Sequence, residues 1–306
     1  MATKKGRLDM AMLTQEQVES YERDGFLIVN NVLTPGEVQE LRAVTEDLVE
    51  KARPLTAHDD VYDLEPSHSA DEPRVRRIKS PHLQAPIYDR VMRHPKILEI
   101  LQQLVAPSIR FDTSKLNMKA AGYGAAVEWH QDWAFYPHTN DDLCAVGVMM
   151  DDCAIENGPL LCIPGSHKGP VHDHHADGHF CGAIDPGSVD LPFDQAVPCT
   201  GPAGSISIHH ARTIHGSALN TSDKMRRLLL FQYRAADAWP LCAGGQMDWD
   251  SWQALMLTGE TDPIAPRMAD VPVRLPLPPA KSQGSIYENQ RGLKRSFFGK
   301  ADTKAA

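Results

Sequence analysis

Three histidines in the sequence are followed two residues later by an aspartate. In a β-strand, two residues at this spacing can bind one metal ion. Residues i and i+2 of a strand project to the same side, so both side chains reach one ion. The pairs begin at His58, His130 and His175, and spacing alone does not choose among them. Only the pair His130 and Asp132 lies among strand-forming aromatic and β-branched residues, in segment 127–136. A buried aspartate needs a partner for its charge, and a metal supplies one.

His215 is the best candidate for a third ligand. Two histidines and one carboxylate hold Fe(II) in oxygenases and leave the opposite face open for a cosubstrate and O2. Arg226 follows His215 by eleven residues and opens a strand, with the turn-like segment 220–223 between them. The two segments are candidates for neighbouring antiparallel strands. The guanidinium fork of an arginine matches the distal carboxylate of a 2-oxo diacid.

The combined motifs resemble the phytanoyl-CoA dioxygenase family. The resemblance rests on Trp-His-Gln-Asp at 129–132, Glu-Asn-Gly-Pro-Leu at 156–160 leading to Ile-Pro-Gly-Ser-His at 163–167, and His-Gly-Ser at 215–217 with Arg226. It covers roughly residues 14–240. It implies a double-stranded β-helix (jelly-roll, cupin-like) fold, Fe(II), 2-oxoglutarate and O2. The implied reaction is hydroxylation of an unactivated C–H bond, with release of succinate and CO2.

By this resemblance, His130, Asp132 and His215 match the metal ligands. Arg226 matches the arginine that pairs with the C5 carboxylate of 2-oxoglutarate, and Ser217 matches a hydroxyl that assists it. Related halogenases have Ala or Gly where this sequence has Asp132, so hydroxylation is favoured over halogenation.

The resemblance also places a cosubstrate-side residue on the strand before the His-x-Asp pair. The sequence leaves three candidates open for that position: Thr113, Lys115 and Asn117.

Substrate contacts are predicted from strand parity. If Arg226 faces the interior, Gln232 and Arg234 share its face and are candidate substrate contacts, unless a bulge inverts the pattern. The alternate residues Leu229, Phe231 and Tyr233 would then pack outward under the helices. Further candidates are Tyr136 at the mouth of the site and, for an anionic substrate group, Arg76 and Arg77. The competing interpretations are ordinary core packing for the aromatic residue and a solvated surface for the charged ones.

For other polar residues near the motifs, the sequence does not decide between a functional and a structural role. His210 and Arg212 are candidates for supporting the metal ligands through hydrogen bonds, and a surface or core position is equally compatible with them. The histidine-rich segment 172–179 is interpreted as a hydrated loop rather than a second metal site.

Helices come first in the chain and short strands follow. Ser/Thr-x-x-Glu/Gln capping boxes begin helices at Thr14 and Thr34. The first helix ends near residue 24, Pro54 stops the second, and a third is expected at about 85–105. Segment 54–82 is expected to be irregular. Expected strands include 26–29, 145–150, 160–163, 205–209 and 227–234.

This order predicts a mainly β (α+β) protein, a barrel or jelly roll with N-terminal helices packed outside it. Residues 1–12 are expected to be disordered and 13–280 to form one domain. That domain divides into a helical part at 13–107, a barrel at 108–240 and a closing arm at 241–280, which contains the Pro-rich stretch 263–279. Residues 281–306 form a C-terminal tail, in which 285–290 is expected to fold back over the barrel, without an assigned chemical role.

Composition narrows the choice of partners. The formal charge of −9 argues against a general nucleic-acid binder, which needs clustered Lys and Arg. No apolar run approaches the roughly 18 residues of a membrane helix. Six scattered cysteines without a Cys-x-x-Cys pair fit a reducing, cytoplasmic setting. We expect a monomer or homodimer that acts on a small-molecule or natural-product substrate.

Two rival functions remain open at this stage. A cupin-like metal enzyme of another reaction type would assign no task to Arg226 or Ser217. A catalytically silent binding module would have no need to keep the ligand set and the cosubstrate residues together.

Overall fold

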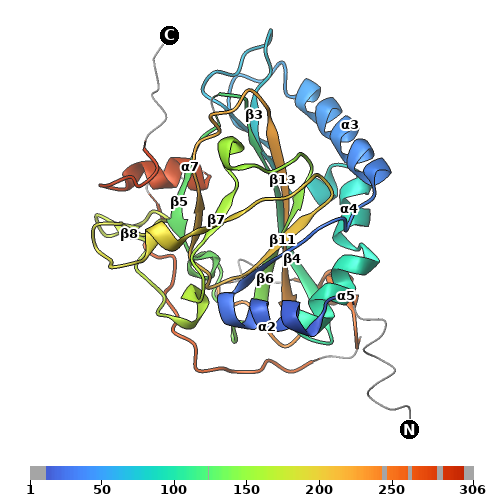
Figure 1. Ribbon diagram of the computed structural model, residues 1–306, viewed down its shortest axis with the longest axis vertical. Helices are drawn as coiled ribbons and strands as arrows, with labels where there is room; N and C mark the ends of the chain where they lie inside the picture. The colour runs from blue at the N-terminus through green and yellow to red at the C-terminus, as the bar shows by residue number, and fades with distance from the viewer. Residues whose placement is uncertain (1–11, 123, 243–246, 261–263, 281–284, 300–306) are drawn as a thin grey trace.

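Two antiparallel β-sheets face each other in the computed structural model, which describes residues 12–122, 124–242, 247–260, 264–280 and 285–299 (Figure 1). The larger sheet has the order β1 (Phe26–Val29), β11 (Ile206–His210), β6 (Leu143–Met149), β13 (Arg226–Ala235), β4 (Ile109–Lys119), β3 (Val75–Lys79) and β2 (Tyr62–Leu64), with β14 (Met256–Thr258) also on β4. The smaller sheet has the order β10 (Val197–Cys199), β7 (Leu160–Cys162), β12 (His215–Ser217) and β5 (Val127–His130). A separate hairpin joins β8 (His175–Ala176) and β9 (His179–Phe180).

Helices of the N-terminal third cover the outer face of the larger sheet (Figure 1). They are α2 (Gln15–Asp24), α3 (Pro35–Lys51), α4 (Pro86–Met92) and α5 (Pro95–Leu104). Both predicted capping boxes are present, at Thr14 and Thr34. Two later helices are α6 (Trp249–Ala254) and α7 (Ile286–Asn289), and 3-10 turns occupy Pro81–Leu83, Asp132–Ala134, Ile155–Asn157, Ser166–Lys168, Phe193–Gln195 and Gln290–Gly292. No helix within the described residues is long and apolar enough to cross a membrane.

Two predictions about the helical part were wrong. The helix expected at 85–105 is two helices, because Pro95 has no amide hydrogen to donate and begins a new helix instead. Segment 54–82 was expected to be irregular, yet it contains β2 and β3. Ile78 is buried and pairs with Leu116 of β4, and Val75 is buried and pairs with Leu64 of β2, so the larger sheet extends further than the sequence indicated.

The later part of the chain also differs in places from expectation. The four barrel strands predicted between 145 and 234 coincide with β6, β7, β11 and β13 to within two residues at each end. In the Pro-rich stretch, residues 264–279 have neither helix nor strand, and the carbonyl of Pro272 accepts a hydrogen bond of 2.9 Å from the indole of Trp133. The predicted disordered N-terminus lies outside the described residues, except for Met12.

Strand β13 divides its side chains between two environments, as its parity predicts. Leu229, Phe231 and Tyr233 are completely buried in the core beneath the helices. Arg226 and Gln232 face the smaller sheet. The register shift beside Gln232 skips a residue of β4, so it leaves the alternation within β13 intact.

We expect Phe231→Ala to lower the free energy of unfolding by about 3–5 kcal/mol, because it leaves a cavity in the main core. Urea denaturation followed by circular dichroism measures the change. Leu83→Ala is the control, since Leu83 is 74% exposed and its truncation should have little effect. Equal stabilities of the two variants would contradict this assignment of the core.

Candidate active site

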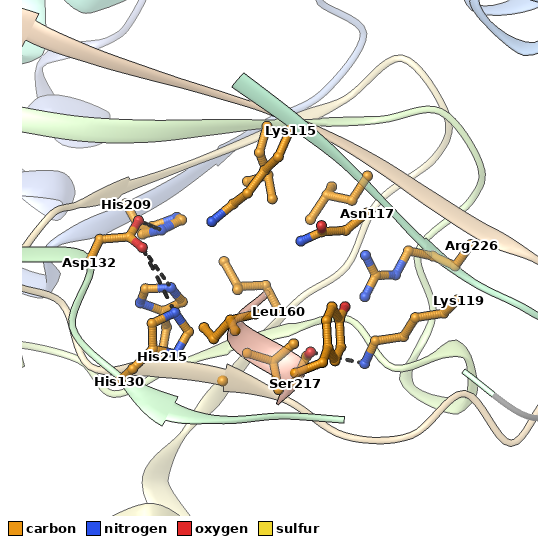
Figure 2. A pocket seen from close by; sticks show the side chains of 16 residues that line it. Lys115, Asn117, Lys119, His130, Asp132, Leu160, His209, His215, Ser217 and Arg226 are labelled. Carbon is orange, nitrogen blue, oxygen red and sulfur yellow. Dashed lines mark hydrogen bonds and ion pairs between the residues drawn. The ribbon is translucent and has the colours of Figure 1, made fainter. Parts of the chain in front are cut away.

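The three predicted metal ligands meet between the sheets, at the end of β5 and the start of β12 (Figure 2). His130 is paired directly with His215 across these antiparallel strands. Asp132 lies in the 3-10 turn that follows β5. One ligand atom from each side chain lies within 4.8 Å of the others, and all three side chains are buried. The strand pairing therefore brings together residues that are 85 positions apart in the sequence.

Hydrogen bonds fix which nitrogen of each histidine faces the metal position. Nδ1 of His130 lies 2.8 Å from the carbonyl of Glu128, and Nδ1 of His215 lies 2.9 Å from the carbonyl of Thr213. Nδ1 is thus the protonated nitrogen, and Nε2 of each ring is left free. The two Nε2 atoms lie 3.8 and 4.0 Å from Oδ1 of Asp132.

The protonation states suit a divalent metal. Burial lowers the pKa of His130 to about 4 and that of His215 well below its usual value, so both rings are neutral. Burial alone would raise the pKa of Asp132, but Lys115 and the neighbouring histidines outweigh it and hold that pKa well below its usual range. Two neutral imidazoles and one carboxylate are the donor set of non-haem Fe(II) oxygenases, so the residues fit that ion.

The second oxygen of Asp132 is held by two groups from the larger sheet. Nε2 of His209 and Nε2 of Gln232 each lie 3.3 Å from Oδ2. Gln232 also contacts the hydroxyl of Tyr136. These contacts leave Oδ1 for the metal. Gln232 and Tyr136, proposed from the sequence as substrate contacts, thus lie next to a metal ligand.

His209 was missed in the sequence, although the alternation in β11 contains the signal. Ser207 and His209 alternate with Ile206 and Ile208, which belong to the main core. His209 therefore points to the opposite face of the sheet, toward the metal position. The residues proposed instead, His210 and Arg212, lie next to Asp141, with which Arg212 forms an ion pair at 2.9 Å.

We expect His209→Ala to weaken metal binding by about 10–100-fold, because a partner that orients Asp132 is lost. The adjacent His210→Ala is a matched control that removes the same ring away from the site. Competition of each variant with a chelator for Fe(II) under anaerobic conditions gives the affinities. Equal affinities of the two variants would rule out this role of His209.

His174, a buried histidine in the segment predicted to be a hydrated loop, accepts a hydrogen bond from Gln131, which lies between the metal ligands His130 and Asp132. The amide of Gln131 donates to Nε2 of His174 at 2.9 Å, and Nδ1 of His174 donates to the carbonyl of His172 at 2.9 Å. Burial lowers the pKa of His174 to about 3, so this ring remains neutral. The interpretation of 172–179 as a simple hydrated loop was therefore wrong for His174, which helps to position the ligand turn.

The far end of the same cavity is cationic. Arg226 is buried, and its Nη2 donates to the carbonyl of Gly158 at 2.7 Å, while its Nε has no hydrogen-bond partner within the described structure. The ammonium of Lys119 donates to the hydroxyl of Ser217 at 2.9 Å and to the carbonyl of Ala218. Burial, with Arg226 nearby, lowers the pKa of Lys119 well below its usual value. Two buried cations at one end of a cavity favour an anionic ligand.

Side chains from both sheets and from α7 line this cavity. Among the described residues they are Lys115, Asn117, Lys119, Val127, His130, Asp132, Leu160, His209, His215, Gly216, Ser217, Arg226, Leu228, Leu230, Ile286 and Tyr287. Asp132 is the only carboxylate among them. In Figure 2 the side chain of Lys115 extends toward Asp132 and His209, while Arg226 and Lys119 lie at the opposite end with Ser217.

Of the three candidates on β4, Lys115 and Asn117 line the cavity and Thr113 does not. Thr113 shares their face of the strand, but it lies further along β4 and is exposed. Lys119 was not proposed, although the same alternation includes it. Strand alternation places Lys115, Asn117 and Lys119 along the cavity wall.

Three arginines proposed as substrate contacts do not line the metal cavity. Arg76 forms an ion pair with Glu288 behind the cavity wall, and Arg77 forms one with Asp63 at 2.6 Å. Arg234 lies on the inward face of β13, but it is buried against Trp252 and lies 3.4 Å from Asp112. Each guanidinium is already paired with a carboxylate outside the cavity, so the structure does not support Arg76 and Arg77 as anion anchors or Arg234 as a substrate contact.

Comparison with known proteins identifies the family. The sequence profile described as "Phytanoyl-CoA dioxygenase (PhyH)" matches residues 21–228, more than half of the chain. The chain belongs to the phytanoyl-CoA dioxygenase family.

One relative of this chain is a protein of Stutzerimonas stutzeri named "Probable alpha-ketoglutarate-dependent hypophosphite dioxygenase". It is 36% identical over 287 residues, which cover 92% of this chain and 99% of the relative. An ectoine dioxygenase of Bordetella parapertussis is 30% identical and aligns with 74% of this chain and 76% of its own. The L-proline trans-4-hydroxylase of Streptomyces griseoviridis is 32% identical, with coverages of 70% and 83%.

Solved structures establish the fold. EctD from S. alaskensis with bound Fe superimposes with a TM-score of 0.66 at 22% identity, covering 85% of this chain and 89% of that one. The predicted double-stranded β-helix fold is confirmed, although the sheets do not close into a complete barrel within the described residues. The protein is an Fe(II)- and 2-oxoglutarate-dependent oxygenase that acts on a small molecule, as the sequence predicted.

Proposed function

We propose that this enzyme oxidises a small oxyanion next to the metal, and that hypophosphite is its substrate. The proposal draws on the hypophosphite dioxygenase relative, which aligns with nearly its whole length. The observation that carries it is the ammonium of Lys115. This group extends toward the metal ligands and has no hydrogen-bond or ion-pair partner among the described residues (Figure 2). Lys115 is half-buried and its charge acts on the metal ligand Asp132, so this position favours a further anionic group beside the metal.

The residues that line the cavity form two anion sites, one beside the metal for the substrate and one at Arg226 for 2-oxoglutarate. His130, Asp132 and His215 would hold the metal, which together with 2-oxoglutarate and O2 would supply the oxidising power. Arg226 holds the distal carboxylate of 2-oxoglutarate at the far end, assisted by Ser217, which Lys119 orients. The separation of Lys115 from Arg226 in Figure 2 supports a second anion site beside the metal.

The other residues near the metal orient the substrate and limit access. The carboxamide of Asn117 lines the cavity with Lys115, and its Oδ1 is buried without a hydrogen-bond partner in the described structure. It is available to the substrate or to the cosubstrate. Gln232 and Tyr136 close the side of Asp132 that faces away from the metal. We propose that Lys115 positions a P–H bond toward the metal while this wall excludes water.

The proposed reaction balances without a further reductant. One P–H bond of hypophosphite becomes P–OH, which gives phosphite. 2-Oxoglutarate loses CO2 and becomes succinate, so each substrate receives one atom of O2. Mixing the enzyme with Fe(II), 2-oxoglutarate and hypophosphite should therefore yield phosphite and succinate in a 1:1 ratio. Phosphorus NMR measures the first product and chromatography the second.

The same assay distinguishes oxidation of an oxyanion from hydroxylation of a C–H bond. Ectoine and L-proline, named for the other relatives, serve as alternative substrates. Coupled succinate formation with either of them, and none with hypophosphite, would contradict the oxyanion proposal. It would leave the Fe(II) and 2-oxoglutarate chemistry intact.

We expect Lys115→Met to raise the KM for hypophosphite by about 30-fold or more, since removing the charge partner of an anion enclosed in the cavity typically costs about 2–5 kcal/mol. Lys79→Met is the matched control. Lys79 lies opposite Lys115 on β3, but its ammonium already bonds the carbonyl of Asp59 and lies 3.3 Å from Asp63. Steady-state phosphite production gives the KM of each variant. A KM for Lys115→Met equal to that of the control would refute the anchor role.

We also propose that the enzyme works in the cytoplasm. Five of the six cysteines are buried free thiols, and the Sγ atoms of Cys162 and Cys199 lie 3.8 Å apart without a bond between them. This arrangement suits a reducing compartment.

A further inference from the structure

A short C-terminal segment, Ser285–Gln290, forms part of the wall of the cosubstrate cavity. Its residues Ile286 and Tyr287 line the same space as Arg226 and Lys119. Figure 1 shows α7 beside β5, although about half the chain separates them in sequence. The matched family profile ends at residue 228, so it assigns no role to this segment.

The segment is held to both sheets. Glu288 forms an ion pair with Arg76 of β3, in the larger sheet. Gln290 accepts a hydrogen bond of 2.9 Å from the amide of Glu128 in β5, in the smaller sheet. Its side-chain amide also donates to the carbonyl of Gly182 at 3.0 Å. These contacts fix the backbone directly after Tyr287, so the fold restricts the position of its ring.

The residues after this segment add a second attachment to β5. The carboxylate of Glu128 accepts hydrogen bonds from the hydroxyl of Ser296 and from the amide of Phe297. The rings of Phe297 and Phe298 pack against Trp129, with centroids 5.6 and 5.2 Å from the indole. Trp129 directly precedes the metal ligand His130, so the end of the chain is anchored next to the site.

Tyr287 has the surroundings of a group that binds an anion. Its ring is covered on one face by the guanidinium of Arg76, 4.4 Å from the centroid. Its hydroxyl has no hydrogen-bond partner in the described part of the chain, although the side chain is buried. Burial raises the pKa of Tyr287 against the opposing influence of Arg76 and Arg226, so the phenol remains a neutral donor.

We propose that Tyr287 is a cosubstrate-binding residue, which donates its hydroxyl hydrogen to the distal carboxylate of 2-oxoglutarate beside Arg226. The bound carboxylate then accepts hydrogen bonds from both the unpartnered Nε of Arg226 and the hydroxyl of Tyr287. The side chain of Ile286 lines the same cavity as Leu228 and Leu230. This inference rests on the proposed cosubstrate site at Arg226.

Anaerobic titration of the Fe(II)-loaded enzyme with 2-oxoglutarate tests the inference by direct binding, without turnover. Tyr287→Phe keeps the ring and removes the hydroxyl. We expect it to raise the Kd about tenfold or more, as for a lost hydrogen bond to a charged group. Tyr287→Ala also opens the wall and should raise the Kd further. Fe(II) affinity should remain unchanged in both variants, because the metal ligands lie at the other end.

Lys294→Ala is the matched control. Lys294 lies four residues after this segment, but it is exposed and paired with Asp177 at 2.7 Å. Its variant should bind 2-oxoglutarate as the wild type does. A Kd within twofold of the wild type for Tyr287→Phe would overturn the inference, even if Tyr287→Ala fails to fold. Absence of 2-oxoglutarate binding by the wild type would instead overturn the proposed cosubstrate site itself.

Discussion

Replacing Asp132 by alanine should abolish coupled turnover and weaken Fe(II) binding by more than about a hundredfold. Loss of a hydrogen-bonded neighbour of a ligand typically costs 10–100-fold in metal affinity, and loss of the ligand itself should cost more. The variant also leaves His209 and Gln232 without their shared acceptor in a buried site. Chelator competition under anaerobic conditions measures the affinity, and succinate formation measures the turnover.

Asp141→Ala is the control for Asp132→Ala. Asp141 is a partly buried aspartate of the same region, but it pairs with Arg212 and does not line the cavity. The Asp141→Ala variant should bind Fe(II) as tightly as the wild type does. Retention of full metal affinity and of succinate formation by Asp132→Ala would show that Asp132 is not a ligand.

The metal ligands could be predicted from the sequence because their geometry is local. His130 and Asp132 need only strand periodicity and the turn that follows it, and His215 lies in a recognisable motif. The contacts that complete the site are not local. His209 reaches Asp132 from β11 of the opposite sheet, and nothing in the spacing of 77 residues between them indicates that pairing.

Charge compensation distinguishes the predicted arginines Arg76 and Arg77 from the cations that line the cavity. Arg76 and Arg77 are a conspicuous basic pair in the sequence, and an anion was expected beside them. Their partners are Glu288 and Asp63, at sequence distances of 212 and 14 residues. A sequence shows which residues carry charge, whereas only the fold shows which charges are already paired. Lys115 is a less conspicuous cation that forms no close ion pair among the described residues, and its charge acts on the metal ligand Asp132.

The C-terminal tail illustrates the same limit. The sequence around 285–290 predicted a segment that folds back, and the structure places it there. Its position beside Arg226 depends on Arg76 and Glu128, which are in two different sheets. No periodicity within the tail contains that information, so its chemical role could not be assigned from sequence.

Replacing Arg226 by alanine should raise the Kd for 2-oxoglutarate by about 30-fold to several thousandfold. Truncating one member of a buried charge pair costs about 2–5 kcal/mol, and the distal carboxylate would lose its principal cation. Fe(II) affinity should change little, because Arg226 lies at the opposite end of the cavity from the ligands (Figure 2). Anaerobic titration measures both constants on the same protein.

Two further variants separate charge from geometry in this prediction. Arg226→Lys keeps the charge but loses the planar fork, so its Kd should lie between those of the wild type and Arg226→Ala. Arg227→Lys is the matched control on the same strand. Its side chain points to the other face, where it pairs with Asp151 at 2.8 Å and with Glu46 at 3.1 Å. If Arg226→Ala binds 2-oxoglutarate as tightly as this control, Arg226 does not hold the cosubstrate, and Lys119 becomes the remaining buried cation at that end.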